Sequence, residues 1–173
     1  VLDYWFSVKS KQFWFASTPQ IDNEIKVRFE RIWEKAAAGE FGHWRDTADG
    51  SVALIVILDQ LPLNMYRSDP KSFQTETMAV EVALNAINNG YDEELNDEKL
   101  LFLFMPLMHS ENIDHQNLQV YLFEKYNFNL DFSKHHRGLV KRFGRFPHRN
   151  EILGRMSTME ELDYLLSDNA FKG

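Results

Sequence analysis

Two stretches of this chain are apolar on every side, and they restrict its fold more than any other feature. They are VALIVIL at 52–58 and LLFLFMPLM at 100–108. Both are far shorter than the about 20 residues that a membrane-spanning helix needs, so each should lie in a protein core. The β-branched residues of 52–58 favour a strand, but nothing nearby resembles a partner strand or a tight hairpin turn. We therefore predict that both stretches are central helices.

Capping and stop signals predict further helices on either side of these stretches. Thr18-Pro19, or alternatively Asp22, opens a helix that Gly39 follows, and Asp69-Pro70 opens one that Gly90 stops. The expected ranges are about 18–38, 69–89, 113–126 and 133–144, with a short closing helix after a capping box at Ser157–Glu160 or Thr158–Glu161.

These elements predict an all-α fold. The length of 173 residues and the 44% apolar composition suit one globular domain with a core of its own. No Gly-, Ser- or Pro-rich linker divides the chain, and no repeat of 20 to 50 residues is evident. We therefore expect residues 1–173 to form a single all-helical domain.

Composition also limits the possible functions. The net charge of −7 argues against general nucleic-acid binding. The absence of cysteine excludes thiolate metal sites, disulfides and cysteine nucleophiles. The first residues, VLDYWFSVKSK, lack the basic start and apolar core of a signal peptide. The simplest expectation is a cytoplasmic protein with no membrane partner and no cofactor.

Polar clusters follow both apolar stretches. The first runs into Asp59-Gln60 and then Asn64, and the second runs into His109-Ser110-Glu111. Polar groups at the edge of a core often form the floor of a pocket. The alternative is simple helix termination, because helix ends need polar partners in any case.

Positive charge is concentrated in residues 133–155, which carry a net +6 while the other residues sum to −13. On a helix over 133–144, His136 falls in the middle of the apolar face, and Arg137 and Arg142 lie on its flanks. A histidine in this position is more often a satisfied core residue than a ligand. The lysines on the opposite side are most simply solvated.

The stretch RFGRFPHRN at 142–150 contains the end of this helix and the turn after it. Gly144 allows a helix to end and Pro147 prevents its continuation, which places Arg145, His148 and Arg149 in one turn. Guanidinium groups this close repel one another unless an anion lies nearby. That anion is either internal, with Asp59 or Glu111 as the candidates, or a ligand. The sequence leaves both possibilities open.

The sequence lacks the motifs of several well-known catalytic and phosphate-binding sites. The chain has no glycine-rich phosphate loop, no nucleophile elbow and no HExxH. His109, Glu111 and His115 are spaced so that they do not share one helical face, so we expect no metal site. A general acid–base pair of His109 and Glu111 is chemically possible.

The longer motifs of the chain resemble a known family. They are FWF near the start, GEFGHW at 39–44, LDQLPLNMYR at 58–67, FMPLMHSEN at 104–112 and HRGLVKRFGRFPHRNEILGRMST at 136–158. Together they resemble the bacterial family of uncharacterised proteins called domain of unknown function 924, over essentially the whole chain. The resemblance implies an all-helical, tetratricopeptide-like array and carries no established activity.

The resemblance also marks a set of polar residues. The matching positions are Asp59, Gln60, Asn64, Arg67, His109, Ser110, Glu111, His136, Arg137, Arg142, Arg145, His148, Arg149 and Asn150. Leu63 departs from the family, which usually has arginine there. If that arginine helps to bind a ligand, its loss weakens or changes the site.

Two functional hypotheses result. In the first, a cationic pocket binds a small anionic ligand, and His109, Glu111 and His148 are the candidates for proton transfer. In the second, the chain is a helical module that binds a protein or peptide partner, and the arginine-rich loop is a structural clasp.

Overall fold

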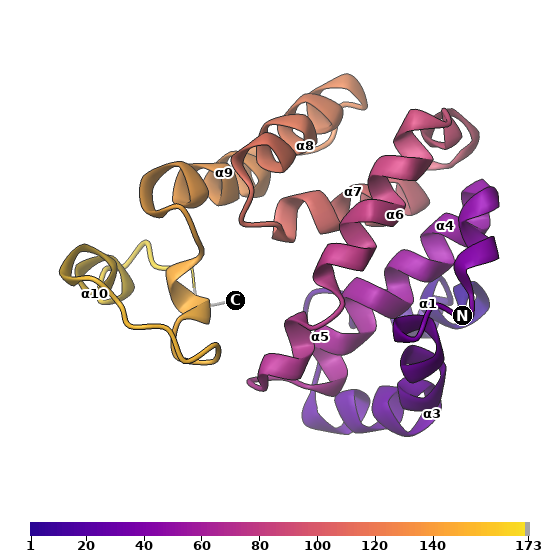
Figure 1. The fold of residues 1–173 in the computed structure, drawn as a ribbon, viewed down its shortest axis with the longest axis horizontal. Coiled ribbons are helices and arrows are strands. Elements are labelled where there is room, and N and C mark those ends of the chain that lie inside the picture. The colour runs from indigo at the N-terminus through magenta and orange to yellow at the C-terminus, as the bar shows by residue number, and fades with distance from the viewer. Residues whose placement is uncertain (172–173) are drawn as a thin grey trace. The chain divides into compact units, whose positions relative to one another are not determined.

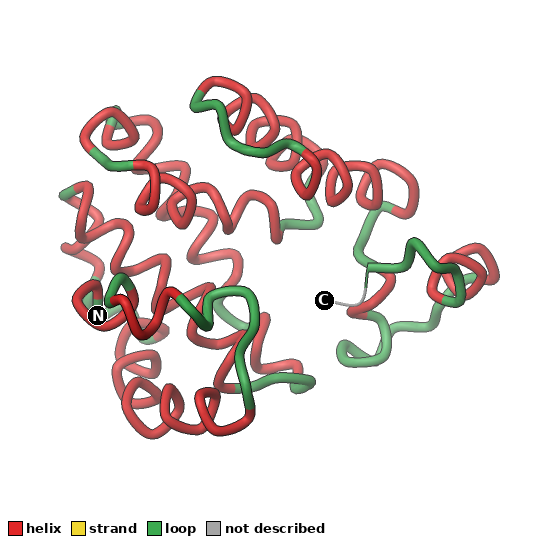
Figure 2. Tube along the Cα trace, turned by 180° about the vertical axis from the view of Figure 1, so that it is seen from behind, coloured by secondary structure: helices red, strands yellow, loops and turns green. Residues whose placement is uncertain are grey.

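The computed structural model describes residues 1–171, and these residues contain helices and connecting loops without a β-strand (Figures 1 and 2). The prediction of an all-α fold is confirmed. Along the chain the fold divides into two compact units, Val1–Pro106 and Leu107–Gly173. That all 173 residues form one domain, and that the array is tetratricopeptide-like, stay predictions. None of the described helices is long and apolar enough to cross a membrane.

In the unit Val1–Pro106, α3 packs against α5 and α4 packs against α6. Short 3₁₀ helices connect them. In chain order the elements are α1 (Leu2–Trp5), α2 (Val8–Lys11), α3 (Pro19–Ala37), the 3₁₀ helix η1 (Gly42–Asp46), α4 (Ala48–Ile55), the π-helical turn η2 (Val56–Gln60), α5 (Leu61–Met65), the 3₁₀ helix η3 (Pro70–Phe73), α6 (Glu76–Asn88), the 3₁₀ helix η4 (Tyr91–Glu94) and α7 (Asp97–His109), whose last residues belong to the second unit.

The predicted boundaries of α3 are confirmed. The Thr18 hydroxyl accepts a hydrogen bond from the amide of Ile21, Pro19 occupies the first turn, and Gly39 follows with a positive φ of 81°. A positive φ is a conformation that glycine adopts without steric cost. Ile25, Phe29 and Trp33 are buried on one side of the helix, as their spacing predicts.

Both apolar stretches form helix, as predicted. Residues 52–58 run through α4 into η2, where the amide of Leu61 bonds to the carbonyl of Val56, five residues back. The carbonyl of Leu58 accepts a hydrogen bond from the Thr75 hydroxyl at 2.5 Å, and that hydroxyl accepts one from the Trp33 indole at 3.1 Å. Thr75, just before α6, and Trp33 of α3 therefore hold this irregular turn in place.

The predicted helix over 69–89 is wrong in one respect, since the structure divides it in two. Asp69 caps the 3₁₀ helix η3 by accepting from the amide of Lys71, and α6 begins only at Glu76. Thr75 lies between them with a non-helical φ of −108° and ψ of 9°. Its hydroxyl is held by Leu58 and Trp33, so these tertiary hydrogen bonds override the local helical pattern.

The unit from Leu107 contains α8 (Ile113–Lys125), α9 (Asp131–Phe143), the 3₁₀ helix η5 (Pro147–Arg149) and α10 (Met159–Leu165). α8 packs against α9, and a buried polar contact joins them, in which the Ser133 hydroxyl donates to the Gln119 amide oxygen. The capping box that opens α10 uses Thr158 and Glu161. A small apolar core holds this end of the chain together and comprises Leu139, Val140, Phe146 and Tyr164.

Candidate functional site

The polar residues expected from the sequence are divided between the two units. In the first unit, Asn64 and Arg67 follow the π-helical turn and both bind Asp22 of α3. The Asn64 amide donates to Asp22 Oδ1 at 2.9 Å, and Arg67 Nε donates to Oδ2 at 2.8 Å. Burial alone raises the pKa of Asp22, but hydrogen bonds from Arg67, Asn64 and Ser17 outweigh it and hold the pKa below its ordinary value. These two residues hold α5 to α3.

Asp59 and Gln60 lie inside the π-helical turn and are both buried. The Gln60 amide donates to Asp59 Oδ2 at 2.5 Å. Single π-helical turns often occur where a fold redirects side chains for a function. The sequence prediction that both residues take part in ligand binding stays a prediction.

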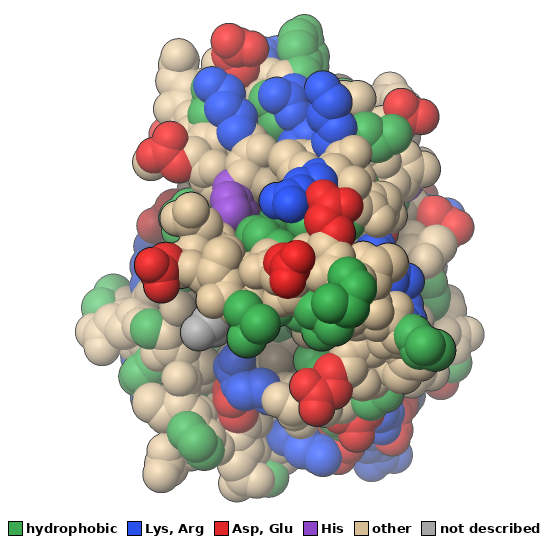
Figure 3. Space-filling model, turned by 90° about the vertical axis from the view of Figure 1, so that its left-hand side faces the viewer, with side chains coloured by type: hydrophobic (Ala, Val, Ile, Leu, Met, Phe, Trp, Pro, Cys, Tyr) green, Lys and Arg blue, Asp and Glu red, His purple; other side chains and the backbone are tan. Residues whose placement is uncertain are grey.

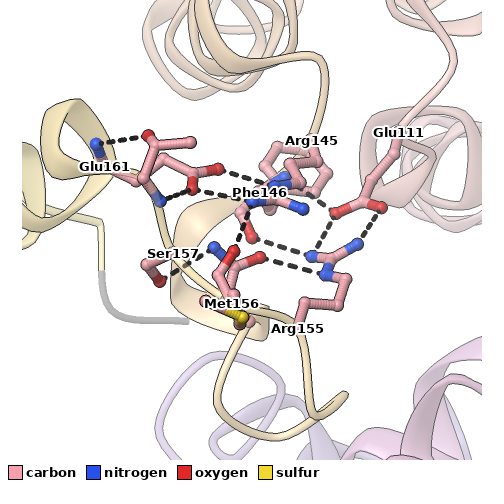
Figure 4. Close-up of polar contacts among 9 residues, drawn as sticks. Glu111, Arg145, Phe146, Arg155, Met156, Ser157 and Glu161 are labelled. Atoms are coloured by element: carbon pink, nitrogen blue, oxygen red, sulfur yellow. Dashed lines mark hydrogen bonds and ion pairs between the residues drawn. The ribbon is translucent and has the colours of Figure 1, made fainter.

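In the second unit, Glu111 stands between α7 and α8 and holds the arginine-rich loop. Arg155 Nη1 donates to Glu111 Oε2 at 2.6 Å and Nη2 donates to Oε1 at 2.9 Å, while the backbone amide of Phe146 donates to Oε1 at 2.7 Å (Figure 4). Burial raises the pKa of Glu111, but the bonds from Arg155 and Phe146 more than offset this, so the pKa lies below its usual value. Glu111 is therefore an ionised structural acceptor.

A second ion pair joins the same loop to α10. Arg145 Nε donates to Glu161 Oε1 at 2.6 Å and Nη2 donates to Oε2 at 2.8 Å, and a further bond runs from Nη2 to the Met156 carbonyl at 2.9 Å (Figure 4). The Glu161 carboxylate also accepts from the amide of Thr158. These hydrogen bonds, chiefly the one from Arg145, lower the pKa of Glu161 to about 2. We call the two ion pairs, Arg145–Glu161 and Arg155–Glu111, the clasp.

The other arginines and Asn150 also have protein partners. Arg142 forms an exposed ion pair with Glu160. Arg149 is buried, lies over the Phe146 ring at 4.7 Å and donates to the His109 carbonyl at 2.8 Å. Asn150 bridges Arg155 and Ser157 through its side-chain amide. Arg137 differs, because it lies in α9 at intermediate exposure and forms no ion pair with a carboxylate of the described residues.

The predicted position of His136 on the apolar side of α9 is confirmed, and His148 lies near it. Their rings contact the same two aromatic residues, Phe146 and Phe171. Burial is the main cause of a lowered pKa at both, to about 4 for His136 and about 3 for His148. Both imidazoles are therefore neutral at pH 7, and neither supplies positive charge for an anion.

One hollow of about 590 Å³ opens beside the clasp, and a recess with apolar and basic side chains at its rim is visible in Figure 3. Its walls come from η5, from the loop before α10 and from α10 itself. Four of its residues are apolar and four are polar, namely Pro147, Met156, Leu162 and Leu165, and His148, Glu151, Arg155 and Ser157. We call it the Met156 hollow. Its volume lies within the range of small-ligand sites.

Sequence reasoning did not include Arg155, Glu160 and Glu161 among the site residues. A signal for Glu161 was present, because its place in a capping box puts a carboxylate at the start of α10. The expected internal acids were Asp59 and Glu111. Glu111 does serve as one, and it binds Arg155, which lies outside RFGRFPHRN, together with the backbone amide of Phe146 within that stretch. Arg145, which the sequence placed in a turn that needs an anion, binds Glu161, an acid that was not among the expected ones.

Two of the candidates for proton transfer, Glu111 and His109, are engaged in hydrogen bonds within the protein. Both oxygens of Glu111 accept hydrogen bonds, and His109, at the end of α7, contributes its carbonyl to Arg149. Within the described residues no three His, Asp or Glu side chains gather in a way that would hold a metal ion. The proton-transfer roles of His109, Glu111 and His148 stay predictions.

Comparison with known proteins places the chain among relatives of unknown function. A solved structure of a protein of unknown function from Agrobacterium tumefaciens is 34% identical, with a TM-score of 0.86 over 91% of this chain and 90% of that chain. No curated protein matches. The family model described as "Bacterial protein of unknown function (DUF924)" matches residues 1–169. The chain therefore belongs to this bacterial family, as its motifs indicate.

Proposed function

We propose that this protein is a helical interaction module that binds a short peptide segment of a partner in the Met156 hollow. An apolar side chain of the partner would sit against Pro147, Met156, Leu162 and Leu165. The two ion pairs of the clasp would hold the walls of this hollow in place. No catalytic step is part of the proposal.

The observation that carries the proposal is the pairing of the arginines with internal carboxylates. Arg145 and Arg155 each bind both oxygens of a glutamate. A guanidinium that is already paired in this way has little attraction left for an external anion. His148, the other basic side chain of the hollow, is neutral at pH 7 because burial lowers its pKa to about 3. A small anionic ligand, the competing proposal, therefore has less support.

The lining of the hollow supports an apolar occupant. Met156 is 90% exposed and Leu162 is 42% exposed, so both present apolar surface that a partner can cover. Methionine adapts its shape to different partners and is frequent at peptide-binding surfaces. Hydrogen-bonding groups beside the apolar wall, including Ser157 and Glu151, would orient the backbone of the peptide.

The test is a selection of binding peptides from a random display library, followed by calorimetry with the best binders. We expect the selected peptides to share an apolar anchor residue. Leu162→Asp should weaken their binding at least about tenfold, because it removes one apolar contact and buries a charge. Leu166→Asp is the matched control, since Leu166 is 87% exposed and does not line the hollow.

Two outcomes would contradict the proposal. One is a set of binders that tolerate Leu162→Asp as well as they tolerate Leu166→Asp. The other is a rise in melting temperature with phosphate, sulfate or a dicarboxylate that Arg155→Lys abolishes. That second outcome would support an anionic ligand. Lysine keeps the positive charge of Arg155 but cannot bind an anion in a bidentate way.

A further inference from the structure

α9 carries three cations in a line. Lys134 and Lys141 are exposed, and Arg137 lies between them along the helix, at intermediate exposure and next to its buried side. The positions i, i+3 and i+7 fall close together around a helix, and they extend over roughly 10 Å along its axis. Figure 3 shows Lys and Arg side chains gathered at the top of the face that it draws. We call Lys134, Arg137, Lys141 and the glycine among them, Gly138, the basic face of α9.

These three cations differ from the other basic residues of the same segment. Arg142, Arg145 and Arg155 each pair with a glutamate. Within the described residues, by contrast, Lys134, Arg137 and Lys141 have no carboxylate within ion-pair distance. Asp131, the only acidic residue of α9, lies in its first turn and does not pair with Lys134. The cations of the basic face therefore repel one another without internal compensation.

Gly138 is a second and independent feature of this face. It is exposed in the middle of α9, and a Cβ added to it would meet no atom within 4 Å. Its φ is not in the left-handed region, so the helix does not require glycine there. Glycine disfavours a helix relative to alanine, and no packing within the fold explains the choice. A missing Cβ on an outward face is useful where the backbone of another molecule approaches closely.

We propose that the basic face of α9 is a docking surface for an acidic helical segment of another protein. Carboxylates at i, i+3 or i+4, and i+7 of a partner helix repeat at the same spacing as the three cations, so each would meet one of them. Gly138 lets the two helices approach closely between the charged pairs, as small residues do at helix–helix contacts. The proposal rests on α9 alone and does not depend on the Met156 hollow.

Charge and shape both select a protein segment over other anionic partners. The whole chain carries a net charge of −7, which repels an extended polyanion such as DNA or an anionic bilayer. A short acidic segment interacts only with the local positive face. Neither a bilayer nor a phosphate backbone would need the space that Gly138 leaves, whereas a helix backbone would.

The probe is a synthetic 18-residue helical peptide with glutamates at i, i+4 and i+7 and alanine between them, labelled for fluorescence anisotropy. We expect it to bind the full chain, with affinity that falls as salt is added. Lys134→Glu/Lys141→Glu should weaken binding at least about tenfold, since two attractive pairs become repulsive. Arg31→Glu/Arg45→Glu is the control, because it changes the net charge equally at two exposed arginines of the other unit.

Gly138→Ala distinguishes a docking surface from a basic face that only contacts solvent. We expect this variant to fold with a melting temperature raised by about 2–4 °C and to bind the acidic helix several-fold more weakly. A variant that is stabilised and binds as well as the native chain would contradict the role of the close approach. Leu162→Asp should leave binding of the acidic helix unchanged. The experiments therefore distinguish a failure of the peptide-binding proposal for the Met156 hollow from a failure of the docking proposal for the basic face.

The remaining outcomes identify other occupants. A scrambled peptide of the same composition that binds equally well would show that the spacing is irrelevant and would overturn the helix–helix proposal. Vesicles with phosphatidylserine, or duplex DNA, that bind more tightly than the peptide and lose binding in Lys134→Glu/Lys141→Glu would also overturn it.

Discussion

Glu161 is only 2% exposed, yet its partner Arg145 is 28% exposed, so the ion pair between them spans the boundary from core to solvent. The carboxylate accepts two bonds from the guanidinium and one from the amide of Thr158. One side chain thereby completes a capping box and ties the end of α9 to the start of α10. A buried carboxylate of this kind is stable only while its donors are in place.

The first prediction follows from that burial. Glu161→Ala should lower the free energy of unfolding by about 2–3 kcal/mol, because charge-assisted hydrogen bonds and a helix cap are lost together. Glu160→Ala is the neighbouring control, since the Glu160–Arg142 pair is 60% and 53% exposed, and it should change stability by less than about 0.5 kcal/mol. Urea unfolding of both variants measures the difference. An equal loss of unfolding free energy in the two variants would show that the burial of Glu161 does not cause its contribution to stability.

The second prediction concerns the other ion pair of the clasp. A double-mutant cycle with Glu111→Gln and Arg155→Lys should give a coupling energy of about 1–2 kcal/mol, because the two side chains share two hydrogen bonds and are about three-quarters buried. Both substitutions keep the size of the side chain, so packing changes little. A coupling energy near zero would mean that Arg155 contributes only its charge, as in a surface pair.

Local signals predicted the helices well because their causes lie within a few residues. The Thr18 cap, the positive φ at Gly39 and the capping box at Thr158 each depend only on neighbours in the sequence. The division between η3 and α6 was missed because its cause lies elsewhere, in the bond from Thr75 to Leu58. The π-helical turn at Val56–Gln60 has no local signature either.

The candidate site was predicted less completely, for a related physical reason. The sequence identified a cationic loop that needs an anion, and this is correct for Arg145. Which carboxylate meets which guanidinium depends on contacts between positions 16 and 44 residues apart, as in Arg145–Glu161 and Arg155–Glu111. The central aromatic side chain of this region is the fully buried Phe146, and Phe143 is only partly buried against the same core.

The third prediction concerns pH. Burial disfavours the charged ring of His136 and lowers its pKa in the folded protein to about 4, from the ordinary histidine value of 6.5. The unfolded chain therefore binds more protons between these pH values, and the free energy of unfolding falls as the pH is lowered from about 6.5 towards 4. Each such histidine contributes a slope of at most about 1.4 kcal/mol per pH unit. His148 contributes in the same direction.

His136→Phe tests this contribution while it keeps an aromatic ring beside Phe146 and Phe171. Urea unfolding at pH 7.5, 6.5, 5.5 and 5.0 should give a shallower pH dependence in the variant than in the native chain. Measurements stop at pH 5 because below it the loss of the Glu161 carboxylate, with a pKa of about 2 against 4.5, begins to add its own effect. His43→Asn, at an exposed position, should leave the slope as it is. Equal slopes in all three proteins would contradict the assignment to His136.

The last prediction compares Gly138, within α9, with Gly144, which follows the last residue of α9. Gly138 and Gly144 are both exposed, and a Cβ on either would meet nothing within 4 Å. Gly144, however, ends the helix with a φ of 72°, which an L-residue with a side chain adopts at a cost of about 1 kcal/mol. Gly144→Ala should therefore lower the melting temperature by about 2–4 °C, whereas Gly138→Ala should raise it by a similar amount. Differential scanning calorimetry of the two variants checks the opposite signs, and a rise in both would show that the left-handed turn after α9 is not required for the clasp.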